Sequence, residues 1–459
     1  MSMLHHHMHH HGKTRDMTQG PITRELLLFA LPLMFGNIFQ MMYNTVDVIV
    51  VGNFVGKEAL AAVGSTTTII NMLVFFFNGF SIGAGVVIGH HFGARDEEKL
   101  HTAIETTMTM TFLLCIAFTA IGMGYVKPML RIMATPEDVF PDAVRYLTIY
   151  FAGIAGLLIY NIGSGILRAV GNTVMPLMFL VLTSILNIIL DVFFVVSLHL
   201  GIAGVAYATI LSQFISAALT LLLLSSSREI YRLTWHDLRI NRGVLGNIIT
   251  VGLPAGIQSV LTAFSNTFVQ AYINFFGSGC MAGWSCYNKL DQLVFLPMQS
   301  GGMAATAFVS QNIGAKKYER AAKGTARAIE ITLAVTGVII LVLVVFARQA
   351  VMLFTADESV IAFGVMFIRT NTLFLLCNCV NHVLAGALRG RGDSRGPMVI
   401  MLTSFVVIRQ IYLFVMTRFI SNTPQPVGFS YPVGWTACMI IELIYYQVRW
   451  RKKLRGQQE

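Results

Sequence analysis

Apolar stretches of about 20 residues or more recur from Leu26 to Tyr446, and each is long enough to cross a bilayer as an α-helix. No other feature of the sequence constrains the fold as strongly. Of the 459 residues, 55% are hydrophobic and only 12% are charged, whereas a typical soluble domain carries about 25% charged residues. The chain is therefore predicted to be an all-α polytopic membrane protein.

Twelve transmembrane spans are predicted. They begin near Leu26, Ala59, Thr102, Ala143, Met175, Ile202, Val244, Ala282, Ala328, Ile361, Met398 and Pro432. Lys and Arg concentrate in alternate connections, so the positive-inside rule places those connections and both termini in the cytoplasm. The protein is expected in the inner membrane. The net charge of +10 then reflects a basic cytoplasmic face on anionic lipids, and no nucleic-acid partner is expected.

One ten-residue segment occurs twice in the chain. LRAVGNTVMP begins at Leu167 and returns as LRGRGDSRGP at Leu388, and the same offset takes FGAR at Phe92 to IGAK at Ile313. Such a fixed register indicates two homologous halves of six spans each. Parallel halves suit a transporter that opens a central cavity to either side of the membrane. The repeated segment is interpreted as a tight cytoplasmic turn, with its Arg in the headgroup region.

The predicted organisation has five parts. They are an expression tag rich in histidine (1–16), the first half (17–224), a polar cytoplasmic linker (225–243), the second half (244–448) and a basic cytoplasmic tail (449–459).

Two acids lie inside the predicted spans of the first half. Asp47 closes a polar stripe on one face of the first span, and Asp191 follows Asn187 by one turn in the fifth. The rest of the stripe consists of Asn37, Gln40 and Asn44. A carboxylate inside a span is costly and marks a candidate functional site, where a shared proton or a bound cation can compensate its charge. The alternative is that each acid caps a helix or pairs with a buried Arg.

Other charges inside the spans are weaker candidates. Lys289 and Asp291 are two residues apart, so they point to different sides of a helix and are not expected to pair. Asp291 is retained as a candidate of the second half. Arg369 is expected to snorkel to the outer headgroups, and Arg409 is either a buried partner or close to an interface.

The sequence resembles the multidrug and toxic compound extrusion (MATE) family of cation-coupled exporters over nearly the whole chain after Met17. The resemblance rests on LPLMFGNIFQMMYNTVDVIVVG at the start of the first half, on GHHFGAR and QNIGAKK after the second and eighth spans, and on the repeated ten-residue segment. It implies twelve helices in two six-helix lobes that form a V and expel organic cations by alternating access.

The resemblance also implies roles for individual residues. Asp47 matches the family's essential carboxylate, and Asp191 with Asn187 matches its fifth-helix acid and amide. Asn161 and Thr209 complete a polar cluster that resembles a cation site. The seventh span has no acid, and Asn378 stands where other branches place one, so the pattern is closest to the branch named for the DNA-damage-inducible protein F. Candidates for the substrate cavity are Asn37, Gln40, Asn44, Gln258, Asp291 and Asn378.

The expected function is that of a monomeric antiporter, with the proton as coupling ion, that exports organic cations or drugs. A sodium-coupled exporter is one alternative. A flippase for lipid-linked precursors is another, but it needs several cationic side chains inside the membrane for a pyrophosphate. An enzyme is not expected, because the sequence has no spaced set of metal ligands, no nucleophile elbow and no usable phosphate loop. No cofactor beyond the coupling ion is expected.

Overall fold

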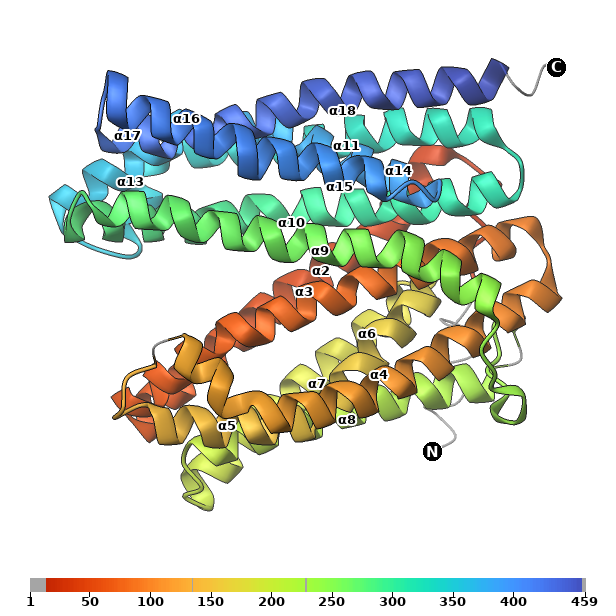
Figure 1. Ribbon diagram of the computed structural model, residues 1–459, viewed down its shortest axis with the longest axis horizontal. Coiled ribbons are helices and arrows are strands. Elements are labelled where there is room, and N and C mark those ends of the chain that lie inside the picture. Colours follow the sequence, from red (N-terminus) through yellow and green to blue (C-terminus); the bar gives the residue numbers. More distant parts are fainter. Residues whose placement is uncertain (1–13, 134, 228, 456–459) are drawn as a thin grey trace. The chain divides into compact units, whose positions relative to one another are not determined.

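A computed structural model describes residues 14–455 except residues 134 and 228 (Figure 1). Within this part of the chain every regular element is a helix. Eleven helices are long and apolar enough to cross a bilayer, and a twelfth span results if α5 (Phe140–Ala152) and α6 (Ile154–Ala169), bent by 50° to each other, are counted as one. The all-α fold and the predicted twelve spans are thus confirmed. The histidine cluster of the predicted tag lies outside the described residues.

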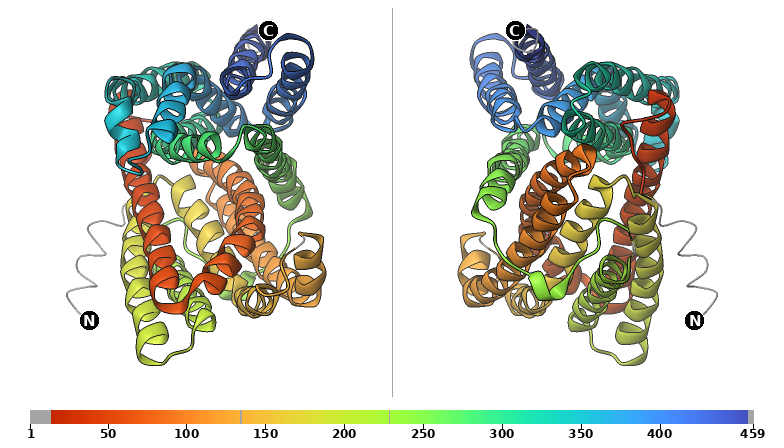
Figure 2. Two further views of the ribbon diagram at one scale, coloured as in Figure 1. Left: turned by 90° about the vertical axis from the view of Figure 1, so that its left-hand side faces the viewer. Right: turned by 90° about the vertical axis from the view of Figure 1, so that its right-hand side faces the viewer.

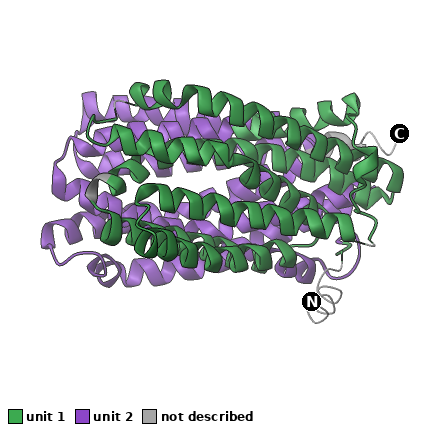
Figure 3. Ribbon diagram, turned by 90° about the horizontal axis from the view of Figure 1, so that it is seen from below, with its two compact units in different colours: residues 1–16, 31–256 green, residues 17–30, 257–459 purple. Residues whose placement is uncertain are grey.

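The chain divides into two compact units (Figure 3). Unit 1 comprises residues 1–16 and 31–256, and unit 2 comprises residues 17–30 and 257–459. The helices α2 (Ile22–Val50) and α9 (Arg242–Asn274) each contribute to both units. In each helix the division falls close to an internal proline, Pro32 or Pro254, where the helical hydrogen-bond ladder is interrupted.

Unit 1 is built around α6. Its other helices are α3 (Lys57–Ala94), α4 (Glu97–Ile132), α5, α7 (Val174–Val192) and α8 (Ile202–Ser226). The helices α3, α4 and α8 all pack against α6 (Figure 2). Their shared core contains fully buried side chains such as Leu130, Phe151 and Leu158, so the unit is held together by apolar packing between helices that are distant in sequence.

Unit 2 is built around the pair α10 (Ser278–Gly314) and α14 (Leu375–Gly390). The helices α11 (Tyr318–Val345) and α18 (Ser430–Arg455) run beside them (Figure 1). The shorter helices are α12 (Ala347–Met352), α13 (Glu358–Asn371), α15 (Arg395–Leu402), α16 (Arg409–Val415) and α17 (Pro424–Gly428). A π-helical segment, Thr403–Ile408, joins α15 to α16 into one span. Trp284 and Phe367 are fully buried at the centre of the core of unit 2.

The backbone repeats the offset found in the sequence. Positive φ angles occur at Gly56 and Gly277, at Arg95 and Lys316, and at Gly171 and Gly392, and the members of each pair are separated by the same offset as Leu167 and Leu388. Left-handed backbone is uncommon outside glycine, so its recurrence at Arg95 and Lys316 is a specific mark of duplication. The pair Gly171 and Gly392 forms the predicted tight turns of the ten-residue segment.

The arginines of the repeated segment hold neighbouring helices. Arg168 Nη2 donates a hydrogen bond to Ser81 Oγ on α3 at 3.2 Å, and Arg389 Nη2 donates one to Gln258 Oε1 on α9 at 2.8 Å. Both side chains are half-buried. These inward contacts were not expected from the sequence, which suggested only a contact with lipid headgroups.

The polar linker is an ordered part of unit 1. Thr234 Oγ1 donates a hydrogen bond to the buried Glu105 of α4 at 3.0 Å, and the backbone N–H of Asn241 donates one to Thr106 Oγ1 at 3.1 Å. The Trp235 ring stacks on Phe112 with 6.0 Å between centroids. Thr234, Trp235 and Asn241 therefore fasten the second half of the linker to α4.

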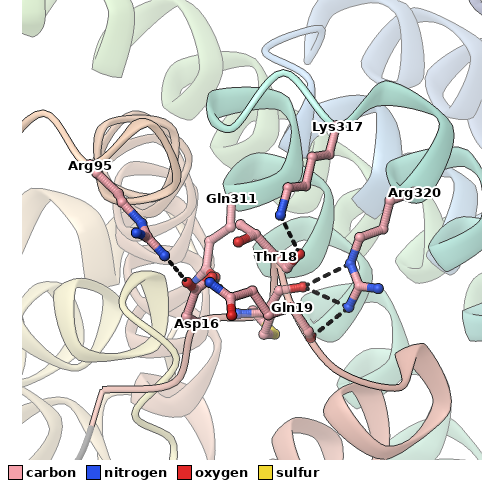
Figure 4. Close-up of polar contacts among 8 residues, drawn as sticks. Asp16, Thr18, Gln19, Arg95, Gln311, Lys317 and Arg320 are labelled. Carbon is pink, nitrogen blue, oxygen red and sulfur yellow. Dashed lines mark hydrogen bonds and ion pairs between the residues drawn. The ribbon is translucent and has the colours of Figure 1, made fainter.

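The residues before α2 are held by the loops that carry the FGAR and IGAK motifs (Figure 4). In unit 1, Arg95 Nη2 pairs with Asp16 Oδ2 at 3.2 Å. In unit 2, Lys317 donates a hydrogen bond to the Thr18 carbonyl at 2.9 Å, and Arg320 Nη2 donates to the Gln19 carbonyl at 2.7 Å. Residues 14–16, which the sequence analysis assigned to the tag, are bonded to the rest of unit 1, through Glu229, the Val170 carbonyl and Arg95 respectively.

Candidate functional site

The two acids predicted in the first half lie together in unit 1. Asp47 on α2 and Asp191 near the end of α7 have carboxyl groups close enough to interact directly. Asp191 is completely buried, and Asp47 is half-buried. Among the described residues neither carboxyl has a basic partner, and both Asp191 oxygens lack a hydrogen bond of normal geometry. The pair therefore concentrates acidic groups without a counter-ion.

Three tyrosines lie beside this pair. Tyr43 precedes Asp47 by one turn of α2, and Tyr146 and Tyr150 are on α5. Tyr43 and Tyr146 interact electrostatically with both carboxyl groups, and the rings of Tyr146 and Tyr150 stack with 6.5 Å between centroids. The sequence analysis missed these tyrosines because aromatic residues in a span face lipid as readily as a polar site. The available signal was a four-residue spacing, which puts Tyr43 and Asp47 on one face of α2 and puts Tyr146 and Tyr150 on one face of α5.

The amide and hydroxyl groups predicted around the acids are in unit 1 but differ in their contacts. Asn187 is buried one turn before Asp191, and neither its Oδ1 nor its Nδ2 has a hydrogen-bond partner among the described residues. Asn161 and Thr209 instead donate hydrogen bonds to carbonyl groups of their own helices, at 2.9 Å and 3.0 Å. Their predicted roles, like that of Asn187, remain predictions.

The polar stripe of the first span is only partly covered. Gln40 and Asn44 are exposed, and Asn37 is half-buried. The part of α2 that carries Gln40 and Asn44 therefore presents amide groups on the surface of unit 1. The assignment of these three residues to a substrate cavity remains a prediction.

The candidates of the second half occupy different parts of unit 2. Asp291 Oδ1 accepts a hydrogen bond from the Tyr287 hydroxyl at 3.4 Å, while Lys289 lies over the Phe354 ring at 5.4 Å from its centroid. Lys289 and Asp291 thus turn to different partners, as their spacing predicts. Gln258 and Asn378 are buried, and Gln258 accepts the hydrogen bond from Arg389.

Glu442 is a buried acid that the sequence analysis overlooked. It lies on α18, is completely buried, and accepts a weak hydrogen bond from the Cys438 thiol at 3.9 Å, while its Oε1 has no partner among the described residues. Arg389 acts on it electrostatically without forming an ion pair. The signal in the sequence was a single acid in the last apolar stretch, close to the basic tail.

These features together define a class of protein. The part of the chain that the structure describes has up to twelve apolar spans, is duplicated at a fixed offset, and places a pair of acids without a counter-ion inside one unit, which is the organisation of a polytopic membrane transporter.

Comparisons with known proteins identify the family. The family MatE matches residues 32–193 and again residues 254–415, once in each half. The chain is 27% identical over 449 residues to the probable multidrug resistance protein YoeA of Bacillus subtilis, covering 96% of both chains. It is 22% identical over 433 residues to the multidrug export protein MepA of Staphylococcus haemolyticus, covering 94% of this chain and 95% of MepA.

Solved structures share the fold. A crystal structure of MATE in the bent conformation superposes with a TM-score of 0.91 at 22% identity, covering 97% of this chain and all of the other. An outward-facing MATE family transporter superposes with a TM-score of 0.90 at 22% identity, covering 96% and 99%. The chain belongs to the MATE family of multi-pass membrane transporters. This membership confirms the predicted resemblance and the expectation of a transporter and not an enzyme.

Proposed function

We propose that this protein exports organic cations or drugs across the inner membrane in exchange for protons, by alternating access. The relatives named above as multidrug resistance or multidrug export proteins support the substrate class. The observation that carries the coupling hypothesis is the interacting pair Asp47 and Asp191, which has no basic partner among the described residues.

The chemistry of the pair explains how exchange would work. Two carboxyl groups in contact away from water cannot both be ionised without a large cost, so the pair holds a proton or attracts a cation. A proton and an organic cation would then compete for the same negative charge, and that competition is what couples the two fluxes. The unpartnered Asn187 amide is available to either occupant.

The proton is favoured over sodium because α9 contains no acidic residue and α14 offers only Asn378 at the position where other branches are expected to carry an acid. Sodium prefers several oxygen ligands, which a second acidic site would supply. A sodium-coupled exporter remains the second candidate for the coupling ion, and no other cofactor is proposed.

The test is uptake of a fluorescent organic cation into everted vesicles, driven in turn by a pH gradient and by a sodium gradient. We expect the pH gradient alone to drive transport. Asp47→Asn and Asp191→Asn should reduce transport to the level of vesicles without the protein, because each removes one acid of the pair. Asp138→Asn, an exposed acid outside the pair, is the matched control and should transport normally.

Other results would contradict the proposal. Transport driven only by a sodium gradient would show that sodium, and not the proton, is the coupling ion. Full activity of both Asn variants at equal expression would show that the coupling site is not the acid pair of unit 1. Inhibition by a lipid-linked sugar, with no transport of any cation, would favour the flippase. We further propose that the protein acts as a monomer, with both termini in the cytoplasm.

A further inference from the structure

Arg409 is a buried cation inside unit 2. Its side chain is 2% exposed at the start of α16. Its Nη1 donates a hydrogen bond to Asn266 Oδ1 at 2.9 Å, and its Nη2 donates one to Ser265 Oγ at 2.6 Å, both on α9. The guanidinium carbon lies 4.7 Å from the centroid of the Tyr431 ring. These contacts orient the guanidinium group, but none of them carries a full negative charge.

The charge of Arg409 has no counter-ion in the described part of the chain. Its Nε has no hydrogen-bond partner, and the guanidinium group forms no ion pair with a described residue. An arginine cannot be deprotonated in a protein, so the cost of burying this charge cannot be avoided by losing a proton. Asp291 and Arg409 both act electrostatically on Tyr431, but Asp291 accepts its hydrogen bond from Tyr287. The guanidinium group is thus oriented and lacks an anion.

One partner of the arginine lies at the surface of unit 2. Asn266, which accepts one of its hydrogen bonds, is exposed, whereas Ser265 is buried. A ligand that displaces or joins the Asn266 side chain would therefore meet the guanidinium group directly. The two-bond fork of an arginine is made by Nε and Nη2, and here Nη2 is engaged by Ser265, so a carboxylate in place of the Asn266 side chain would accept one charge-assisted hydrogen bond from Nη1.

The equivalent helices of unit 1 carry the opposite charge. At the offset that relates the two halves, Asn44 and Asp191 on α2 and α7 correspond to Ser265 and Tyr412 on α9 and α16. The same pair of helices therefore holds two carboxyl groups in unit 1 and a guanidinium group in unit 2.

We propose that Arg409, with Ser265 and Asn266, forms an anion-binding site for a carboxylate of the substrate. The preferred substrates are then zwitterions, in which a carboxylate accompanies the cationic group. The inference rests on the proposed export function and narrows its substrate class. Tyr431 keeps the guanidinium plane in place through the cation–π contact.

The test compares two rhodamine dyes that differ in one group. One has its carboxyl group blocked as a methyl ester and is a cation, and the other has the free carboxylate and is a zwitterion. Initial rates of uptake into everted vesicles under a pH gradient give KM for each dye. For the wild-type protein we expect a lower KM for the zwitterion than for the ester, because only the zwitterion can neutralise Arg409.

Variants of Arg409 should change the response to one dye only. Arg409→Gln is expected to raise KM for the zwitterion about tenfold, the effect of losing one charge-assisted interaction, and to change KM for the ester by less than about twofold. Arg409→Lys should give an intermediate KM, since it keeps the charge but loses the planar fork. The control is Arg348→Gln, an exposed arginine of unit 2, which should leave both KM values unchanged.

The outcomes separate this inference from the proposed function. If the wild-type protein prefers the ester, or if Arg409→Gln changes both KM values equally, the anion site is overturned while cation export stands. If the wild-type protein transports neither dye, export itself fails. The wild-type comparison decides the matter even if Arg409→Gln does not fold, and melting temperatures identify that case.

Discussion

At the scale of single residues, four acids that are buried or half-buried within the two units have different surroundings. Asp47 and Asp191 interact with each other, Asp291 accepts a hydrogen bond from a tyrosine, and Glu442 faces a thiol. None of these four forms an ion pair among the described residues. A buried carboxyl group without a counter-ion is stable mainly in its neutral form. This reasoning predicts a neutral carboxyl group for Glu442, whereas the buried Glu105 lies 3.9 Å from Arg239 Nε and accepts a hydrogen bond from Thr234.

Glu442 offers a direct check of this reasoning. If its carboxyl group is neutral, Gln is nearly isosteric, so Glu442→Gln should change the free energy of unfolding by less than about 1 kcal/mol. Glu442→Ala removes buried volume and should cost about 2 kcal/mol or more. Thermal unfolding of the purified protein in detergent measures both. If Glu442→Gln proves as damaging as Glu442→Ala, the carboxylate is ionised and held by Arg389.

At the scale of helices, glycine determines how closely the spans of each unit approach. In unit 2, a Cβ atom at Gly386 would lie 2.2 Å from the backbone oxygen of Gly302, so α10 and α14 are in backbone contact. In unit 1 the equivalent Gly165 approaches Ser81 as closely, with a Cβ 2.2 Å from Ser81 Oγ. Small residues at such crossings allow helices in a membrane to gain van der Waals contact.

Gly386→Ala should therefore force α10 and α14 apart. The expected loss of stability is about 1–3 kcal/mol, the usual cost of overpacking. Gly337→Ala on α11 is the matched control, because a Cβ there would meet nothing within 4 Å. It should be neutral or stabilising by up to about 1 kcal/mol, since Ala is the better helix former. Equal melting temperatures of the two variants would show that the close contact is not rigid.

At the scale of the whole molecule, twelve spans and the distribution of basic residues predict the sidedness. The linker and the turns at Gly171 and Gly392 follow an even number of spans from the first, and they belong to the basic set of connections. The connection between α16 and α18 belongs to the opposite set. The positive-inside rule therefore predicts opposite accessibility for these two sets.

Cysteine labelling tests this topology. In a cysteine-free background, Asn422→Cys should react with an impermeant thiol reagent in intact cells, and Asp237→Cys only after the cells are permeabilised. Both positions are exposed, so lack of reaction would not be due to burial. The reverse pattern would invert the proposed orientation and place both termini outside.

The positions of the spans could be predicted closely from the sequence, and the deviations have a physical cause. The fifth span starts at Val174, one residue before the predicted Met175, and the sixth starts at Ile202 as predicted. The ninth was expected from Ala328, but α11 begins at Tyr318. Its first turns carry Lys323 and Arg327, so the helix extends beyond the apolar stretch that marks the membrane. Hydrophobicity reports where the membrane is, and a helix can continue into water.

The sequence by itself determined the all-helical class, the twelve spans, the duplication and the positions of Asp47 and Asp191, because these depend on local hydrophobicity, on charge and on a fixed offset. Only the tertiary structure decided which polar groups meet. The contact between Asp47 and Asp191, the tyrosines beside it, the neutral partners of Arg409 and the burial of Glu442 depend on how each helix is rotated against its neighbours. That rotation results from packing between distant segments, so the pattern within a single span does not contain it.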